Sequence, residues 1–503
     1  MGPVGEFLAK LSSDDVVLVA TNDIHAHLAE DKENQRLGLA KLLGFINLLR
    51  KSPARVHVVD CGDAFSGDPF GWIDNGRMVA LVLGAIGFEA MTMGNHDLDY
   101  SVEEANPFHL FNQLIPTMNR KSLAKTKLLA QDLLWQGKPV IGAFSEPIVL
   151  GPLKSGGRLL VVGVHNPHTC RKSLKEALGD FDFGLIDGDL KRTFEKIAKK
   201  LKNSLSGLGP KDLVVVLSHL GGLPSEWVEF SGASLALLPG VSVVIDGHSH
   251  CLCGPRQIGK AIYVNAGHRL EAVTCARATG AGDLEVKLFT YNDLKEIKPD
   301  EKLSAVIEAL SSHLGLDELI TTLPFSFGGR LNDRPAFGRL AIWAILDLVS
   351  ADAAYLNDGA VAGGLNQGKV TRRDLMAALP YKDKLLLITL PGELLIEAVV
   401  RSSSTWRGGW PFWAGIKVKV KKSDNFSILE VTDFSGKTID REKNYRLIIS
   451  DQALRRLGRD LAPKGSRPEV LGRVDQAAAS GLAQMSEDRL RALANLEDFI
   501  IQA

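Results

Sequence analysis

The chain has 503 residues, of which 45 % are hydrophobic and 23 % charged, as is usual for a soluble globular protein. Lysine plus arginine and aspartate plus glutamate both number 59, so the balanced charge gives no reason to expect a nucleic-acid polymer as a partner. One hydrophobic core rarely serves a chain of this length, and we therefore expect two domains.

The five cysteines are too few, and odd in number, for a disulfide framework, which favours a reducing compartment. The first residues lack the basic segment and long apolar stretch of a secretory signal, and no apolar run is long enough to span a membrane. We therefore predict a cytoplasmic protein without a membrane span, although a periplasmic or secreted protein without its leader would look the same. The oligomeric state is left unknown.

The first part of the chain alternates apolar runs typical of buried strands with helical patterns. Helices are predicted over 38–51 and 76–87. Strand-like apolar runs occupy residues 16–20, 55–60, 158–166, 212–220 and 240–250. This alternation predicts an α/β or layered α+β domain, with polar clusters at the carboxyl ends of strands, where such sheets usually bind ligands.

The pattern changes near residue 290. A helix that starts near Pro299 and continues to Leu314 is predicted as a linker. A second unit follows, with a helix over 337–349 and strand-like runs at "KLLLITL", "GIKVKV" and "YRLIISD". We predict a first domain over 1–292, a linker helix over 293–318 and a second domain over 319–503.

Polar clusters end five of the predicted strands of the first domain. Each alone has an ordinary explanation, such as a turn, a capped helix or a buried histidine, although a His-x-His pair on a strand places both rings on one face. Together their oxygen and nitrogen ligands suit two adjacent divalent metal ions. The residues are Asp23 and His25 in "NDIHAH", Asp63 in "CGD", Asn95, His96, Asp97 and Asp99 in "GNHDLD", His219 in "SHLG", and His248 and His250 in "DGHSH".

These five clusters, in this order, resemble those of the calcineurin-like metallophosphoesterases. With its second domain the chain looks like the 5'-nucleotidase group, which includes UDP-sugar hydrolases and 2',3'-cyclic nucleotide phosphodiesterases. The resemblance implies a four-layer β-sandwich flanked by helices and a smaller α+β C-terminal domain that binds substrate. It is strong over the first domain and weak over the second.

The resemblance also implies a role for each matching residue. One metal ion would be held by Asp23, His25, Asp63 and His250, and the other by Asp63, Asn95, His219 and His248, with Asp63 bridging the two. His96 would be the catalytic histidine and Asp99 the acid that orients it, whereas Asp97, which replaces a glutamate, is not expected to be a ligand. The ions could be Mn, Zn, Co, Fe or Mg.

The implied activity is hydrolysis of a small-molecule phosphate ester, first a nucleoside monophosphate or similar phosphomonoester, by in-line attack of a hydroxide bound to both metals. An alternative keeps the chemistry but takes a sugar phosphate, a nucleotide-sugar or a cyclic nucleotide diester. A second alternative is a non-catalytic, metal-containing binding protein.

The second domain departs from the family in its substrate residues. Asn357 matches the expected substrate-binding asparagine, but Ala362 stands where an arginine is expected and Leu385 where an aromatic residue usually stacks on the base. Arg330, Arg334, Arg372 and Arg373 could substitute for the arginine, although each also fits a solvated surface. The aromatic loop "TWRGGWPFWAG" could stack on substrate or simply be packed.

Overall fold

The structure is a computed structural model in which the chain divides into two compact units, Met1–Leu310 and Ser311–Ala503. The boundary lies within helix α11 (Glu301–His313). Among the described residues, no helix has both the length and the apolar character needed to cross a membrane. The described residues are 2–103, 106–120, 124–130, 133–167, 179–184, 189–222, 231–328, 336–403, 412–421, 427–462, 467–496 and 499–502.

Two large sheets form the centre of the first unit. The seven-stranded sheet has, in spatial order, β16 (Leu284–Thr290), β15 (Ala272–Ala278), β1 (Val16–Thr21), β2 (Arg55–Asp60), β3 (Ala90–Thr92), β4 (Lys127–Leu129) and β7 (Ala143–Phe144). The six-stranded sheet has, in spatial order, β13 (Leu252–Ile258), β14 (Ala261–Ala266), β12 (Val243–Asp246), β11 (Leu213–Ser218), β9 (Arg158–Val164) and β8 (Ile148–Pro152).

The alternation of side chains along the strands explains how the sheets pack. In β11, Val215 and Leu217 join the hydrophobic core shared by the two sheets, whereas Val214 and Val216 join the core on the opposite face. Since successive side chains of a strand point to opposite faces, both faces of this strand are covered and its sequence is a continuous apolar run. In β1 Val16, Leu18 and Ala20 belong to the shared core.

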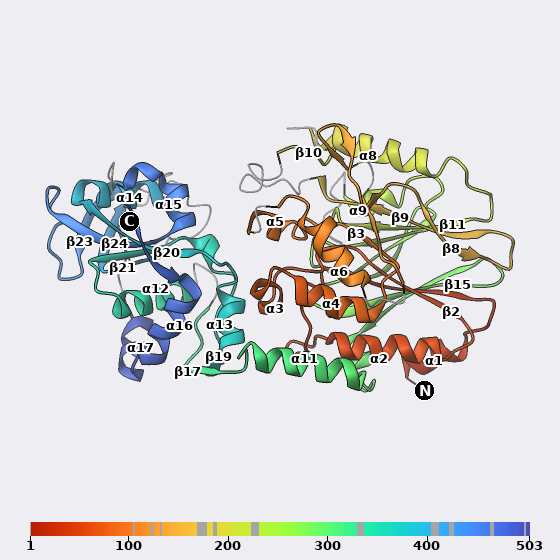
Figure 1. Ribbon diagram of the computed structural model, residues 1–503, viewed down its shortest axis with the longest axis horizontal. Coiled ribbons are helices and arrows are strands. Elements are labelled where there is room, and N and C mark those ends of the chain that lie inside the picture. Colours follow the sequence, from red (N-terminus) through yellow and green to blue (C-terminus); the bar gives the residue numbers. More distant parts are fainter. Residues whose placement is uncertain are drawn as a thin grey trace. The chain divides into compact units, whose positions relative to one another are not determined.

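Helices cover both outer faces of the sandwich. Figure 1 shows α1 (Pro3–Ala9), α2 (Leu39–Arg50) and α4 (Arg77–Ile86) on one side and α8 (Leu190–Ser204) and α9 (Gly232–Leu235) on the other. Leu201 and Leu205, in and just after α8, pack into the outer core of the six-stranded sheet. The first unit therefore has the layered helix–sheet–sheet–helix order that the resemblance implies.

The strand directions bring the predicted site together. β1, β2 and β3 are parallel neighbours, and β11 and β12 are parallel neighbours in the other sheet. The carboxyl ends of parallel strands lie at one edge of a sheet, where ligands usually bind. The five polar clusters directly follow these five strands.

The second unit has a five-stranded sheet and a large helical layer. Helix α12 (Phe337–Leu348) is its central helix, because eight of its twelve residues are buried. The sheet order is β21 (Phe412–Ala414), β18 (Ala353–Leu356), β24 (Asn444–Ser450), β20 (Lys384–Pro391) and β25 (Glu469–Arg473). The other strands are β17 (Leu319–Leu323), β19 (Gly368–Thr371), β22 (Ile416–Lys421), β23 (Ser427–Asp433) and β26 (Phe499–Gln502), and the other helices include α13 (Arg372–Ala378), α14 (Gly392–Ser403), α15 (Asp451–Leu457), α16 (Val474–Gln484) and α17 (Glu487–Ala494).

Candidate metal centre

The loops that carry the predicted ligands have an unusual backbone. Five of the seven predicted metal ligands adopt a positive φ, which residues other than glycine rarely do. Backbone hydrogen bonds hold these loops, from Asp23 N to Gly62 O at 3.0 Å and from His25 N to Asp63 O at 2.8 Å. Such backbone strain clusters at functional sites. The five are Asp23, His25, Asp63, His248 and His250.

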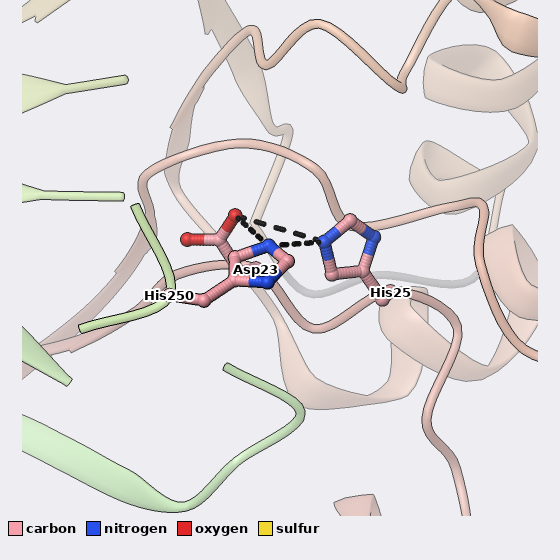
Figure 2. Close-up of side chains that lie close together, drawn as sticks. All are labelled: Asp23, His25 and His250. Carbon is pink, nitrogen blue, oxygen red and sulfur yellow. Dashed lines mark hydrogen bonds and ion pairs between the residues drawn. The ribbon is translucent and has the colours of Figure 1, made fainter. Parts of the chain in front are cut away.

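The first set of side chains, which we call the His250 group, consists of Asp23, His25 and His250. Figure 2 shows the two imidazoles and the carboxylate converging. Nε2 of His250 lies 3.0 Å from Nε2 of His25 and 3.3 Å from Oδ1 of Asp23. One ligand atom from each residue lies within 4.8 Å of the others, a spacing that one metal ion could bridge.

The second set, which we call the His219 group, consists of Asp63, His219 and His248. Their ligand atoms also lie within 4.8 Å of one another. Nε2 of His219 is 3.1 Å from Oδ2 of Asp63. The amide oxygen of Asn95 is 2.7 Å from Nδ1 of His248, which places the fourth predicted ligand beside the group.

The hydrogen bonds of two histidines leave a nitrogen lone pair for a metal ion. A backbone carbonyl can only accept, so Nδ1 of His25 donates to Ser66 O at 2.9 Å and Nδ1 of His219 donates to Cys61 O at 2.6 Å. In the neutral tautomer so defined, each Nε2 is the acceptor and faces its group. Among the described residues, Nε2 of His219 is buried and makes no hydrogen bond. The donor set and this orphaned atom fit a metal ion.

Asp63 lies between the two groups. Its Oδ2 is 3.1 Å from Nε2 of His219 and 4.0 Å from Nε2 of His25, and Oδ1 of Asp23 is 3.8 Å from Nε2 of His219. The two groups are therefore adjacent, and the carboxylates of Asp63 and Asp23 each lie within 4.0 Å of a histidine nitrogen in both groups.

The pKa of His219 differs from the pKa values of His25 and His248. Burial, opposed by the nearby aspartates, lowers the pKa of His25 to about 4, and burial together with His219 lowers the pKa of His248 to about 4. Burial would also lower the pKa of His219, but the carboxylates of Asp63 and Asp23 outweigh it and raise that pKa to about 10. In the metal-free chain a proton on His219 thus compensates the buried carboxylates, and a divalent ion would take its place.

His96 and Asp99 form a pair at the edge of this centre. Nδ1 of His96 lies 2.7 Å from Oδ2 of Asp99, and the ring of His96 packs edge-on against that of His25 with centroids 5.6 Å apart. The imidazole of His96 is 28 % exposed, whereas the predicted ligands Asp23 and His219 have no exposed surface. The hydroxyl of Ser66 lies 3.0 Å from the carbonyl oxygen of His96 and 3.3 Å from Oδ2 of Asp99, so its one hydrogen can serve either acceptor.

Asp97 holds the backbone of neighbouring loops, a role that the sequence pattern did not predict. Its carboxylate accepts hydrogen bonds from the backbone N–H groups of Asp63, Ala64 and Gly94 at 2.8–2.9 Å. It is buried, and burial together with the charge of Asp63 raises its pKa to about 6. Asp97 therefore fixes the loop of Asp63 rather than facing either ligand group.

Two glycines allow the loops to approach closely. A Cβ on Gly94 would lie 2.1 Å from Oδ1 of Asp63, and a Cβ on Gly247 would lie 2.7 Å from Oδ2 of Asp23 and 2.9 Å from Nδ1 of His219. No real side chain fits at such distances. Gly247 thus touches one ligand from each group.

Sequence reasoning missed two side chains that contact the ligands. Nδ2 of Asn22 donates to Oδ2 of Asp23 at 2.9 Å and to Gly267 O at 2.6 Å, which fixes that carboxylate. The ring of His268 stacks on that of His250. Asn22 was visible as a polar residue at a strand end, but nothing in the spacing connects residue 268 to the other clusters.

The second unit gives a mixed result for the predicted substrate residues. Asn357 directly follows β18 and is buried, and neither amide atom has a hydrogen-bond partner among the described residues. The virtual Cβ of Gly359 lies 3.4 Å both from Nδ2 of Asn357 and from Nη1 of Arg456, so this arginine lies near the asparagine. Leu385 is buried in the core of the unit and is not placed to contact a ligand.

The other basic and aromatic candidates of the second unit form ion pairs, are buried in the core, or lie outside the described residues. Arg372 pairs with Glu318, and Arg373 pairs with Asp317 at 3.1 Å. Phe412 and Trp413 are buried in β21, and the ring of Trp413 packs at a tilt against that of Tyr355. The remaining candidates, Arg330, Arg334, Trp406 and Trp410, lie outside the described residues.

Comparison with known proteins covers both units. Residues 16–252 match the family described as calcineurin-like phosphoesterase, and residues 324–458 match the 5'-nucleotidase C-terminal domain. The chain is 22 % identical to a 5'-nucleotidase of Vibrio cholerae over 86 % of this chain and 83 % of that protein. It is also 22 % identical to protein UshA of Yersinia enterocolitica over 90 % of this chain and 86 % of that protein.

A solved structure shares the fold of the whole chain. The 5'-nucleotidase precursor of Thermus thermophilus is similar with a TM-score of 0.62 and 19 % identity, and the match covers 97 % of this chain and 99 % of that one. At this identity the likeness concerns the fold alone.

Proposed function

We propose that the substrate of this chain is a nucleoside monophosphate or a similar phosphomonoester. The premise is that the chain belongs to the calcineurin-like phosphoesterases with a 5'-nucleotidase C-terminal domain. The membership makes it a metallophosphoesterase of the 5'-nucleotidase family, a hydrolase of phosphate esters. The precise ester and the role of each residue are the parts proposed here.

The proposed metal ligands follow the two groups. Asp23, His25, Asp63 and His250 would hold one divalent ion, and Asp63, Asn95, His219 and His248 the other. Two such ions neutralise phosphate oxygens and lower the pKa of a water molecule so that it can act as a nucleophile near neutral pH. Imidazole with carboxylate suits Mn, Fe, Co or Zn, so the ligands do not select one metal among these.

The residues of the chain supply the rest of the chemistry. His96 is the exposed imidazole beside the centre and would stabilise charge on the transferred phosphoryl group or protonate the leaving oxygen. Asp99 accepts from Nδ1 of His96, and the carboxylate at that position orients the ring and favours the charged imidazolium. The hydroxyl of Ser66 lies beside Asp99.

The second unit favours a substrate whose recognition does not depend on aromatic stacking at residue 385. Leu385 is 1 % exposed, so it cannot clamp a base, and Ala362 supplies no charge. Asn357 and the neighbouring Arg456 are polar groups that remain for recognition. This observation supports the second candidate, the same chemistry on a sugar phosphate, nucleotide-sugar or cyclic nucleotide diester.

The observation that carries the proposal is the adjacency of the two ligand groups with the His96–Asp99 pair beside them. The test is phosphate release by the purified chain from a panel of nucleoside monophosphates, sugar phosphates, nucleotide-sugars and cyclic nucleotides, with each candidate metal. Turnover of nucleoside monophosphates above the other classes supports the first substrate class. Preference for another class would replace it with the second candidate.

We also propose a reducing compartment for the protein. All four described cysteines, Cys61, Cys251, Cys253 and Cys275, are free thiols, and three of them are buried. Secretion is the alternative, since one structural relative is described as a precursor. Fractionation of cells that express the native gene separates the two.

A further inference from the structure

His250 is held differently from the two histidines of the centre that donate to a carbonyl. Nδ1 of His25 and Nδ1 of His219 each donate to a backbone carbonyl, which fixes the rotation of the ring. Within the described part of the chain no such hydrogen bond reaches Nδ1 of His250. Its side chain is also 42 % exposed, compared with 7 % for His25 and 0 % for His219. Its Nε2 contacts His25 at 3.0 Å and Asp23 at 3.3 Å, but neither burial nor a hydrogen bond at Nδ1 fixes the rotation of this ring.

A second imidazole takes the place of that hydrogen bond. The ring of His268 stacks face to face on the ring of His250, with centroids 4.7 Å apart and planes 5° from parallel. His25 contacts the same ring edge-on, with centroids 4.9 Å apart and planes at 76°. His250 is thus confined between one ring against its face and another across its edge.

His268 is itself held by a hydrogen bond at Nε2 and has a carboxylate beside Nδ1. Its Nε2 lies 3.2 Å from Nη2 of Arg36, which can only donate, so Nε2 is the acceptor. Nδ1 then carries the hydrogen and lies 3.3 Å from Oε2 of Glu271. The backbone N–H of His268 donates to the same oxygen of Glu271 at 3.3 Å, whereas Nδ1 makes no hydrogen bond among the described residues. Arg36 therefore sets the tautomer of the ring, and Glu271 holds the backbone of His268.

The backbone beside His268 ties this arrangement to the ligand group. The N–H of the next residue, Arg269, donates to Asp23 O at 2.7 Å, and the guanidinium of Arg269 donates to Gly67 O at 2.9 Å. Arg269 adopts φ +48, so the segment is shaped for this contact. The loop that presents His268 is therefore anchored to the same loop that presents Asp23.

We propose that His268, clamped by Arg36 and Glu271, is a positioning residue that orients His250 for the metal ion of the His250 group. The inference rests on the proposed function, because it concerns the ligand role of His250. Partners that orient a metal-binding histidine typically change metal affinity by about 10–100-fold when removed. His268 acts on one of the two ions, since its ring contacts only the His250 group among the ligands.

The test measures metal affinity rather than turnover. The metal-free chain is titrated with Zn²⁺ against a chromophoric chelator, which gives a dissociation constant for each of two ions. We expect His268→Ala to weaken the binding of one ion by about tenfold and to leave the dissociation constant of the other ion within about twofold of its original value. His268→Phe keeps a ring to stack and should lose less, and Glu271→Gln should fall between them.

The matched control is His57→Ala, because His57 also pairs through Nδ1 with a glutamate, Glu89 at 2.8 Å, but lies at neither ligand group. Unchanged constants in His268→Ala, or equal loss of both ions, would overturn the inference. If His268→Ala does not fold, the dissociation constants of His268→Phe and Glu271→Gln decide instead. The inference is overturned if neither variant differs from the original chain. Failure of the unaltered chain to bind two ions would instead contradict the proposed function.

Discussion

The two ligand groups use the same kinds of side chain but are held in different ways. In the His219 group Asp63 and His219 are buried, and His219 is fixed by a carbonyl at 2.6 Å. In the His250 group one ligand, His250, is 42 % exposed and is held by a stacked ring. We therefore expect one ion to be bound in a closed position and the other at the more accessible edge of the centre.

The largest effect should come from the residue that joins the groups. Asp63→Asn removes the charge that lies near Nε2 of both His219 and His25, so both ions should be lost together. Because two cations contribute several kcal/mol and 1.36 kcal/mol is a factor of ten, we expect activity to fall by about 10³–10⁴-fold. Metal content by mass spectrometry and phosphate release measure this. The surface variant Asp283→Asn is the control, and retention of two ions with full turnover by Asp63→Asn would break the account.

The next largest effect should separate chemistry from metal binding. His96→Ala should lower kcat by about 10²-fold or more, if His96 is the acid that we propose for the transition state. Neither ion should be lost, because His96 belongs to neither group, and Asp99→Asn should give a smaller loss in the same direction. Rate measurements with metal-saturated protein test this. Loss of an ion in His96→Ala would mean that the residue is a ligand.

Substitution of Gly247, which lies against a residue of each group, should weaken the binding of both ions. Gly247→Ala would place a methyl group within 3 Å of Asp23 and His219, so both ions should bind about tenfold more weakly. Gly254 provides the control, because a Cβ there meets nothing within 4 Å. The two dissociation constants from Zn²⁺ competition decide the matter. Selective loss of one ion in Gly247→Ala would contradict the shared position of this glycine.

The smallest expected effect is a difference between His219 and His25 in the protons that they release when metal binds. The carboxylates of Asp63 and Asp23 outweigh burial and raise the pKa of His219 to about 10, above 6.5 for an ordinary imidazole, so at about pH 8 the metal must displace a proton from it. The pKa of His25 is lowered, mainly by burial, to about 4, so it releases none. Affinity in the His219 group should therefore rise with pH up to about 10 and then level.

Calorimetry in two buffers of different ionisation enthalpy measures the protons released. The expected result is release of about one proton, assigned to the His219 group by its absence in His219→Ala. Proton uptake, or release that persists in His219→Ala, would contradict the assignment.

The sequence predicted the elements around the site well because its signals are local. The apolar run over 55–60 matches β2 (Arg55–Asp60), and the helix predicted over 38–51 is α2 (Leu39–Arg50). The polar residues that stop these runs are adjacent because parallel strands end at one edge. The prediction of a mixed α/β, two-domain member of this family is confirmed.

What the sequence could not provide depends on contacts between distant segments. The stack of His268 on His250 forms only when the loop after β14 meets the loop after β12. The three hydrogen bonds to Asp97 depend on how closely the loops after β2 and β3 approach. In the sequence, Leu385 stands where the resemblance places an aromatic residue that stacks on the base, and only the structure shows that it is a core residue of the second unit.

The central claim is that two ions in adjacent groups make this chain a phosphohydrolase. Its most direct test is to titrate the metal-free chain with Mn²⁺ or Co²⁺ and follow both bound metal and phosphate release from p-nitrophenyl phosphate. We predict that turnover rises only as the second ion binds and that Asp63→Asn abolishes it. Stoichiometric binding of two ions without turnover of this ester, its bis-ester or any nucleotide would contradict the claim and favour a non-catalytic binding protein.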